Sequence, residues 1–584
     1  MPSNAPVHSF HIPVMGTGFT IDTPLKVAKF GISSVVSLVD DTLIEQMRRK
    51  ISEGLGRAYQ AIDERSEDSR ARRITAYLNL MHERVEEQMA ILRASVFEKG
   101  SELSEYFEML PTSPLRSAYE AMLSVGDPDT RARLQDELRR LVVPGNIDVN
   151  IMTKLDRERF RAGQQLGPRF SDAMTALRGF AESKLSSSVV LSAGINAKLY
   201  AYLAEFADFL PDDAGNLKKK IVLKVSDFRS ALVQGRMLAR KGLWVSEYRI
   251  ESGLNCGGHA FGAKGQLMGP LLEEFRSGRD ALVEQLHAAC NKAREKLGQV
   301  ELSVAPPVRV TVQGGIGTSE EDAMLHDLYG VDGTGWASPF LLCPDVVSID
   351  PDHLHRIEAA GENDVQLSNA SPLGVPFWSL KTSESEETRR SRIAEGHPGS
   401  NCPKGYLVSN TEFTKKPICT ASRAYQQLKL KQLGMVESDV TDKACICHDL
   451  AGGATKPSGI DPDAHTAVCC GPNTVYFERQ AGLREMIDHI YGRARLPFKI
   501  ERPHMFIKEL SLHVQRLRGE LGDKLETAGQ AAAESRDNLM LGIGFYREQA
   551  SRLAADKREE FLAQLESLRE ELDRILPGDR QNSP

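Results

Sequence analysis

The sequence predicts an α/β fold: a parallel (β/α)₈ TIM barrel with a large helical insertion after the second strand and a mostly helical C-terminal extension. Eight short β-rich runs alternate with helical patterns, which is typical of a parallel barrel. Several runs are almost continuously apolar, as expected for strands covered on both faces. With 584 residues, 41% hydrophobic and 26% charged, the chain is long enough for a barrel of roughly 250 residues plus attached units.

The predicted strands share short length and apolar or β-branched composition. In chain order they are HIPVM (11–15), SSVVSL (33–38), DVNIM (148–152), SVVLS (188–192), IVLKV (221–225), WVSEYRI (244–250), VRVTV (308–312) and VDGTGW (331–336). We therefore expect the barrel to comprise residues 10–40 and 147–365.

Residues 41–146 are rich in helix formers with apolar spacings of three and four, as in Ile74, Leu78 and Met81. This stretch is too long for a simple connection between a strand and the next helix. It is interpreted as a helical insertion, or a lid, after the second strand.

Beyond the barrel we expect three further parts. Residues 366–478 form an irregular or α+β segment that contains cysteines, 479–577 are helical, and 578–584 form a disordered tail. A short heptad pattern runs from Phe561 to Ile575. Its helix either packs on its own chain or forms a homodimer through the C-terminal helices.

The charge pattern excludes some partners. With 73 Lys and Arg against 80 Asp and Glu, the formal charge of −7 gives no basic field for nucleic acid or anionic membranes. No stretch approaches the roughly 18 apolar residues of a membrane span, and MPSNAPVHSF lacks a signal-peptide pattern. We expect a cytoplasmic protein that acts on a small molecule.

Two glycine-containing turns follow the last two predicted strands. The first holds Gly314, Gly315 and Gly317, and the second holds Gly335, Ala337 and Ser338. Such turns bring backbone N–H groups close to an anion, and a helix predicted to begin near Ser319 would favour it further. In (β/α)₈ barrels, phosphates bind after strands 7 and 8.

The motif RIESGLNCGGHAFG (249–262) follows the sixth predicted strand. At this end of a barrel strand, side chains face the active-site mouth. Gly257 and Gly258 would let the backbone approach a planar ligand, and His259 exchanges protons near neutral pH. The alternative is a tight turn whose histidine only makes a hydrogen bond.

Several motifs, in this order, resemble the nitronate monooxygenase (2-nitropropane dioxygenase-like) family of FMN-dependent barrels, and the related flavin enoyl reductases of the polyunsaturated fatty acid synthase type. They are IPVMGTGFT (12–20), VNIM (149–152), VLKVSDFRSA (222–231), CGGHAFG (256–262), QGGIG (313–317) and GVDGTGWASPFLLCPD (330–345). The resemblance covers roughly residues 10–350. It implies that Met15, Gly16, Asn150 and Lys224 contact the flavin and that His259 is the catalytic acid or base.

The resemblance implies an FMN-dependent oxidoreductase that acts on a nitronate or a similar acidified carbon. An enoyl reductase using NAD(P)H and a non-catalytic flavin- or phosphate-binding scaffold stay open as alternatives. Asn255 stands where the family usually has an acidic residue, and Ala337 where the last phosphate turn usually has glycine. These departures put the substrate in question more than the flavin.

Six of the nine cysteines fall in one stretch: Cys402, Cys419, Cys445, Cys447, Cys469 and Cys470. Four thiolates can hold zinc or an iron–sulfur cluster. No C-x-x-C pair is present, however, so ordinary reduced cysteines and no metal are favoured over a metal or cluster. Cys256, beside the glycine pair, is expected to be a small buried filler.

Overall fold

A computed structural model describes residues 6–153, 156–161, 164–192, 194–260, 264–435, 437–523, 529–554 and 557–576. Eight parallel strands close into a barrel: β1 (Phe10–Ile12), β2 (Ser33–Ser37), β3 (Ile147–Ile151), β6 (Ser188–Leu191), β7 (Lys220–Val225), β8 (Val245–Glu251), β9 (Arg309–Gln313) and β10 (Gly333–Gly335). All eight predicted strands are present, so the predicted barrel is confirmed. The tail expected at 578–584 lies outside the described residues.

Each strand pairs with the next barrel strand along the chain, and β1 closes the ring against β10, where Phe10 lies opposite Thr334. Val35, Val190 and Val222 pack together from three strands as a separate buried cluster, consistent with a side-chain layer inside the barrel. The first strand is shorter than expected because Pro13, which has no N–H to donate, follows it directly.

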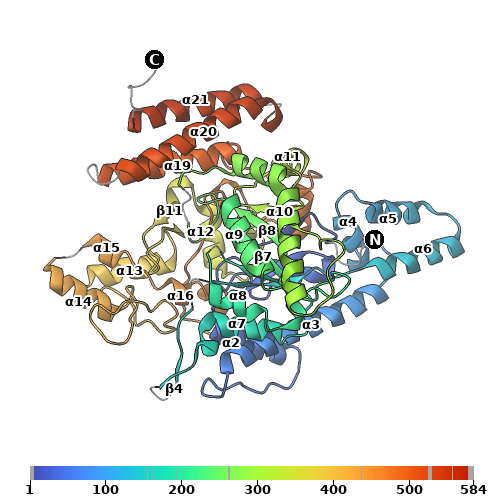
Figure 1. The fold of residues 1–584 in the computed structure, drawn as a ribbon, viewed down its shortest axis with the longest axis horizontal. Coiled ribbons are helices and arrows are strands. Elements are labelled where there is room, and N and C mark those ends of the chain that lie inside the picture. Colours follow the sequence, from blue (N-terminus) through green and yellow to red (C-terminus); the bar gives the residue numbers. More distant parts are fainter. Residues whose placement is uncertain are drawn as a thin grey trace.

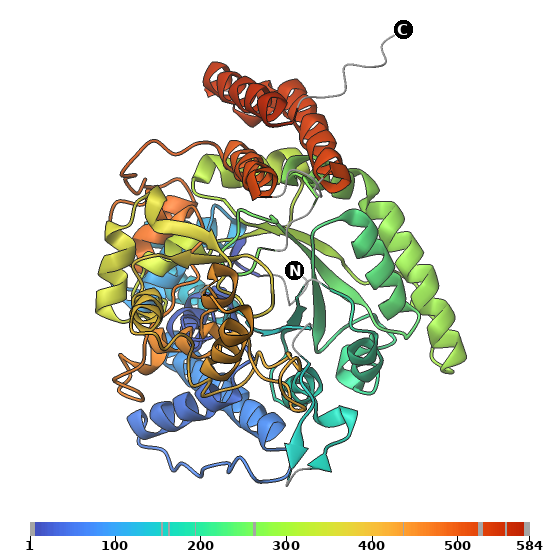
Figure 2. The ribbon, with the colours of Figure 1, turned by 90° about the vertical axis from the view of Figure 1, so that its left-hand side faces the viewer.

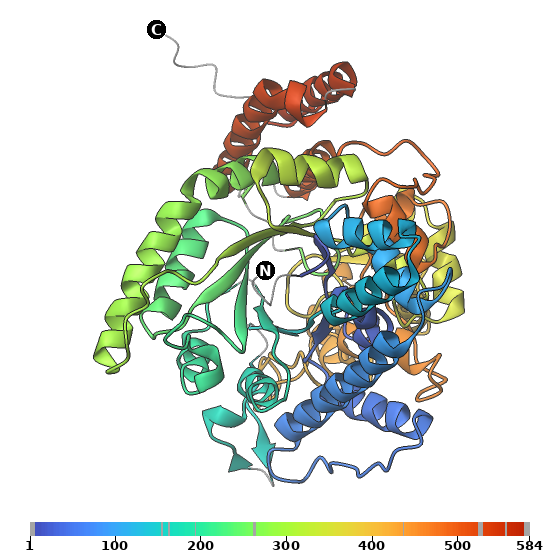
Figure 3. The ribbon, with the colours of Figure 1, turned by 90° about the vertical axis from the view of Figure 1, so that its right-hand side faces the viewer.

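Helices connect the strands and surround the barrel: α1 (Thr23–Val27), α2 (Asp41–Gly54), α3 (Ser69–Ala94), α7 (Asp172–Ala181), α8 (Ala197–Leu203), α9 (Phe228–Ala239), α10 (Met268–Lys296), α11 (Ser319–Tyr329) and α12 (Pro351–Ala359). A short 3₁₀ helix, η4 (Ser338–Leu342), follows β10. Figure 3 shows the long helices α3 and α10 on the outside of the barrel.

The predicted insertion contains α2, α3, α4 (Glu102–Met109), α5 (Pro114–Ser124) and α6 (Pro128–Leu141). The helix α3 packs against α7 and so belongs to the ring around the barrel. The helix α4 packs near the start of β2, where Tyr106 lies beside Gly31. Figure 1 places α4–α6 on the side away from β11. The insertion is therefore not a lid over the carboxyl ends of the strands.

Residues 366–478 cover the other side, in front of the barrel in Figure 2. They begin within β11 (Val365–Ser368) and contain β12 (Phe377–Leu380) and short helices: α13 (Glu384–Ala394), α14 (Arg423–Leu433), α15 (Ser438–Thr441), α16 (Ile446–Asp449) and α17 (Gly452–Thr455). The backbone of β12 bonds to the loop after β8, because the Trp378 N–H donates to the Gly258 carbonyl at 2.8 Å. This segment is attached directly to the predicted Gly-Gly-His motif.

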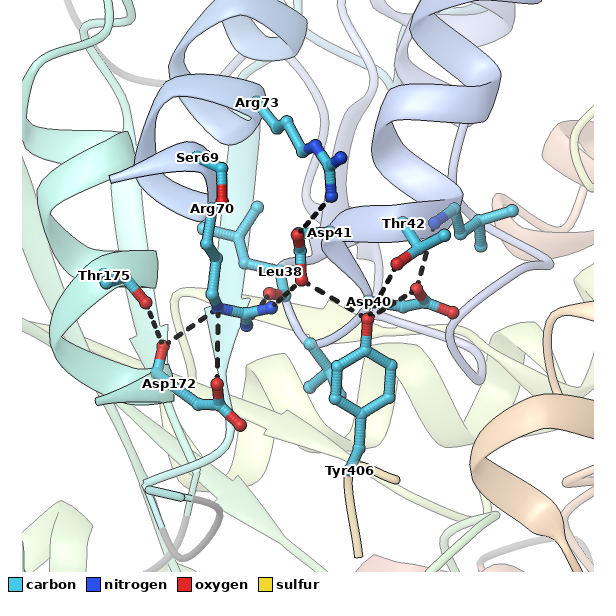
Figure 4. Close-up of polar contacts among 12 residues, drawn as sticks. Leu38, Asp40, Asp41, Thr42, Ser69, Arg70, Arg73, Asp172, Thr175 and Tyr406 are labelled. Atoms are coloured by element: carbon cyan, nitrogen blue, oxygen red, sulfur yellow. Dashed lines mark hydrogen bonds and ion pairs between the residues drawn. The ribbon is translucent and has the colours of Figure 1, made fainter. Parts of the chain in front are cut away.

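A buried ionic network fastens this covering segment to the barrel (Figure 4). The carboxylate of Asp41 binds Arg70 at 2.6 Å and Arg73 at 3.1 Å. Tyr406, from the covering segment, donates its hydroxyl to Asp40 at 3.0 Å, and Lys404 forms an ion pair with the same carboxylate. The loop around residues 404–406 is thus held at the carboxyl end of β2.

The C-terminal part contains α18 (Leu483–Ile490), α19 (Met505–Asp523), α20 (Gly529–Leu553) and α21 (Arg558–Ile575). The last three helices pack on one another, and α20 also packs on α10. Phe561, Leu565 and Leu572 of the predicted heptad are buried there, so the chain itself covers this seam. Among the described helices, none is both long and apolar enough to cross a bilayer.

Candidate active site

A cavity of about 190 Å³ opens at the carboxyl ends of the barrel strands. Twelve of the thirteen residues singled out from the sequence line it: Met15, Gly16, Asn150, Lys224, Gly257, Gly258, His259, Gly314, Gly315, Gly335, Ala337 and Ser338. They come from six separate stretches of the chain. The barrel brings them together because parallel strands all end at the same face.

The turn after β9 is built for glycine. Gly314 and Gly315 have φ angles of +110° and +87°, which other residues rarely adopt. A Cβ atom at Gly314 would come within 2.5 Å of the Cys256 sulfur, and one at Gly315 would overlap the Asn255 amide. The turn thus packs tightly on the residues that precede Gly257.

Gly317 does not line the cavity. Its N–H donates to Glu321 at 2.9 Å, and Glu321 forms an ion pair with Arg502 at 2.7 Å. The first turn of α11 also carries Glu320 and Asp322. The first turn of this helix therefore carries three acidic side chains, of which Glu321 is paired with Arg502.

Two buried amide oxygens at the cavity wall have no hydrogen-bond partner within the described residues. They are Asn150 Oδ1 and Asn473 Oδ1. Leaving a buried acceptor unpaired costs about 1–3 kcal/mol, so such groups cluster where a ligand completes them. The cavity wall is suited to a ligand that presents several N–H or O–H donors.

An ion pair forms part of the cavity wall. Lys224 Nζ lies 3.1 Å from the carboxylate of Glu251, which also accepts a hydrogen bond of 2.7 Å from Gln313 Nε2. Lys224 thus lines the cavity, with its charge balanced by the carboxylate of Glu251, the last residue of β8. Glu251 was not predicted from the sequence, although it is the last residue of β8, the strand that precedes the Gly-Gly-His loop.

His259 reaches the cavity from the loop after β8. Its Nε2 atom lies 2.7 Å from the hydroxyl oxygen of Ser371, and its ring meets the edge of Phe377 with centroids 5.0 Å apart. The imidazole is half-buried. Two residues of the covering segment therefore fix its orientation.

The covering segment supplies cavity residues that the sequence did not reveal: Phe377, Leu450, Cys469, Gly471 and Asn473. At Gly257 a Cβ atom would lie 2.7 Å from the Cys469 carbonyl oxygen, so the two chain segments meet through backbone. The one available signal was the Gly-Pro pair at 471–472, which predicts a turn but not its location.

Two cysteines at the cavity are poor nucleophiles. Burial raises the pKa of Cys469 to about 12, and burial together with the charge of Glu251 raises the pKa of Cys256 well above its usual value. Both line the cavity, so Cys256 is more than the expected core filler. Their thiols stay protonated at neutral pH and contribute surface rather than charge.

Another group of potential metal ligands, Asp350, Asp352 and His353, lies at the start of α12. Asp350 accepts from the backbone and ring of His353 and from Thr466. Asp352 forms an ion pair with Arg356 at 2.7 Å. Asp350 caps this helix, and all three side chains already have partners within the protein, which explains the cluster without a metal.

No family model matches this chain, and no curated protein matches it. Solved structures with some similarity include the enoyl reductase domain of MlnA from the macrolactin biosynthesis cluster of Bacillus amyloliquefaciens, at 14% identity and a TM-score of 0.32, covering 74% of this chain and 88% of that one. Another is the nitroalkane oxidase of Streptomyces ansochromogenes, at 13% identity and a TM-score of 0.29, covering 63% and 85%.

Proposed function

We propose that this chain is an FMN-dependent oxidoreductase of the nitronate monooxygenase type, which oxidises a nitronate or similar acidified carbon with His259 as acid or base. The observation that carries the proposal is one cavity, at the carboxyl ends of the barrel strands, that combines a glycine turn, unpartnered amide oxygens and an oriented imidazole. Active sites of such barrels lie at this face.

The residues present fit a flavin mononucleotide. The unpartnered oxygens of Asn150 and Asn473 suit the N–H group of a flavin ring and the hydroxyls of its ribityl chain. Close backbone approach at Gly257 and Gly258 suits a flat ring. Residues of the strand-1 loop, Met15 and Gly16, and Lys224 would contact the same ring.

The phosphate would lie at the turns after β9 and β10. Gly314, Gly315, Gly335, Ala337 and Ser338 line this part of the cavity, beside Gly471. Lys224 is already paired with Glu251, so backbone N–H groups rather than a lysine or arginine would hold the phosphate. Gly317, whose N–H is taken by Glu321, would contribute only by shaping the turn.

When bound, the flavin supplies the electron-accepting chemistry, and the chain supplies position and proton transfer. His259 would take a proton from, or return one to, the carbon that reacts. Ser371 holds the imidazole through Nε2, which fixes the face that the ring presents. The segment at 450–473 shields the reaction from water over the cavity mouth.

Cofactor release and anaerobic reduction test this proposal. Heating should release FMN from the purified protein, and a nitronate added without oxygen should bleach the yellow colour, which returns in air. Bleaching by NADH or NADPH, followed by reduction of an enoyl thioester, would instead make the protein an enoyl reductase. If flavin is bound but neither a substrate nor a nicotinamide reduces it, the protein is a non-catalytic flavin-binding scaffold. If the protein binds no flavin, the proposal is refuted.

A further inference from the structure

Four of the six clustered cysteines form a second site outside the cavity. The chain makes a loop in which Ser400 pairs with Ser422 and Asn410 pairs with Ile418. This folding brings Cys402 and Cys419 together, and their thiols share a hydrogen bond. Sixteen residues separate the two cysteines, so no short sequence motif indicates that they are paired.

The remaining two thiols approach the first pair from a second loop. Cys445 and Cys447 stand at the start of α16 and share a hydrogen bond through their sulfurs. Cys447 lies within electrostatic range of both Cys402 and Cys419. The Cys445 thiol also bonds to Ser400, at the base of the first loop. The four sulfurs therefore form two close pairs that face each other.

The spacing distinguishes between types of metal centre. A tetrahedral zinc with Zn–S bonds of about 2.3 Å needs all four sulfurs within ~3.8 Å of one another. In the part of the chain that the structure describes, no three of these sulfurs lie mutually within 4.8 Å. Two close pairs separated by a wider gap match instead two metal ions that each take two thiolates, as in a [2Fe–2S] cluster with four cysteine ligands.

The surroundings suit a buried anionic cluster. Cys419, Cys445 and Cys447 are each at most 9% exposed. Cys402 has a φ angle of +52°, a conformation that costs energy in a residue other than glycine and that accompanies binding sites. The cation Arg157 lies within electrostatic range of Cys402, and its guanidinium bonds to the Gly405 carbonyl.

The loop that carries Cys402 is also fastened in place, because Lys404 and Tyr406 both bind Asp40 at the end of β2. The second loop leads directly to the cavity, since Leu450 lines it one helical turn after Cys447. Cys469 and Cys470 belong to a different place, beside Gly16 and Gly257.

We propose that Cys402, Cys419, Cys445 and Cys447 ligate a [2Fe–2S] cluster next to the barrel cavity. The site is independent of the flavin: its ligands come from the covering segment alone, and its test requires neither turnover nor bound FMN. The absence of a C-x-x-C pair does not argue against it, because the loop between Ser400 and Ser422 supplies the contact that a short motif usually provides.

The full-length protein is purified without oxygen and reconstituted with ferrous iron and sulfide, then desalted. We expect about two irons and two acid-labile sulfides per chain, visible absorption beyond that of flavin, and an electron paramagnetic resonance signal after dithionite reduction. Zinc without sulfide, at one ion per chain, would overturn the cluster in favour of a mononuclear site. Protein that contains no metal and whose mass is lower by four hydrogen atoms, as two disulfides require, would refute a metal site altogether.

Alanine variants locate the ligands. Cys402→Ala and Cys447→Ala should each lose most of the iron and the reduced-state signal. Cys290→Ala, in the buried part of α10, and Cys470→Ala should retain both. If a ligand variant fails to fold, iron and sulfide on the wild-type protein still decide the question. Full iron content in a soluble Cys447→Ala protein would contradict the assignment.

Discussion

The Nε2 atom of His259 lies 2.7 Å from the Ser371 hydroxyl, a contact that joins the barrel to the segment covering it. The imidazole is therefore oriented by a residue more than one hundred positions away in the chain. His259 also lines the cavity. The position of this imidazole therefore depends on how the covering segment packs on the barrel.

The role of His259 can be separated from that of Ser371. His259→Ala should lower turnover at least about 10²-fold while FMN stays bound, because general acid–base catalysis contributes about 10²–10⁴-fold. Ser371→Ala should cost less, since it removes only the orienting hydrogen bond. Steady-state rates and flavin content of both variants check this. Loss of flavin from His259→Ala would make the histidine structural.

Asn150→Leu should raise the stability of the flavin-free protein and lower its affinity for FMN. It removes a buried oxygen that has no partner among the described residues, so the flavin-free protein should become more stable. It also removes an acceptor from the cavity, so FMN should bind about 10-fold more weakly or worse, a loss of about 1.4 kcal/mol. Thermal unfolding and fluorescence titration measure the two effects.

Ser246→Ala is the matched control for Asn150→Leu. Its hydroxyl is likewise buried without a described partner, but Ser246 does not line the cavity. This variant should leave FMN affinity unchanged. Equal weakening of flavin binding by both substitutions would indicate a general effect on the barrel rather than a contact at Asn150.

Gly315→Ala should destabilise the protein more than Gly434→Ala. Both glycines have positive φ angles, +87° and +71°, so both substitutions strain the backbone by about 1–2 kcal/mol. Only at Gly315 does the added Cβ also overlap a side chain, that of Asn255, whereas Gly434 faces open space. Urea unfolding gives both losses, and comparable values would show that the turn after β9 adapts freely.

The buried ionic network predicts instability in strong acid. Burial alone would raise the pKa of Asp41, but Arg70, Arg159 and Arg73 outweigh it and lower the pKa to about 2. A lowered carboxyl pKa contributes stability that is complete above the usual value of 3.8 and is lost as the pH falls through about 2. Unfolding free energies measured between pH 5 and 2 should fall accordingly.

Asp41→Asn tests the same network at neutral pH. Removing this charge leaves Arg70 buried without its main partner and should cost about 3–5 kcal/mol. The exposed pair of Asp136 with Arg139 provides the comparison, because Asp136→Asn should change stability by less than about 1 kcal/mol. A small effect at Asp41 would mean that solvent reaches the network in Figure 4.

The sequence predicted the barrel well because each strand leaves a local signal. The run at 188–192 and the strand β6 (Ser188–Leu191) differ by one residue, and the other strands were found with similar small errors. Many cavity residues could be predicted for the same reason: Gly315 and His259 lie in loops that follow strands, and the closed barrel brings the ends of its strands together.

Features that depend on distant contacts were not predictable. Asn473 and Phe377 reach the cavity through the covering segment, whose sequence has little periodicity. Gly317 belonged to the right turn, but its N–H donates to Glu321 in the first turn of α11. Cys402 and Cys419 meet only because the loop between them folds back on itself.

The meeting of Gly257 with Cys469 has a consequence for biosynthesis. All eight barrel strands have been synthesised once Gly335 leaves the ribosome. The covering segment that completes the cavity is synthesised only when Gly471 has followed. If the barrel closes before the covering segment is synthesised, the apolar residues Leu341 and Ile316, which line the cavity, are left exposed to water. A chain that ends between these points would contain every barrel strand but expose the apolar residues at the mouth of the cavity, where they could bind other chains.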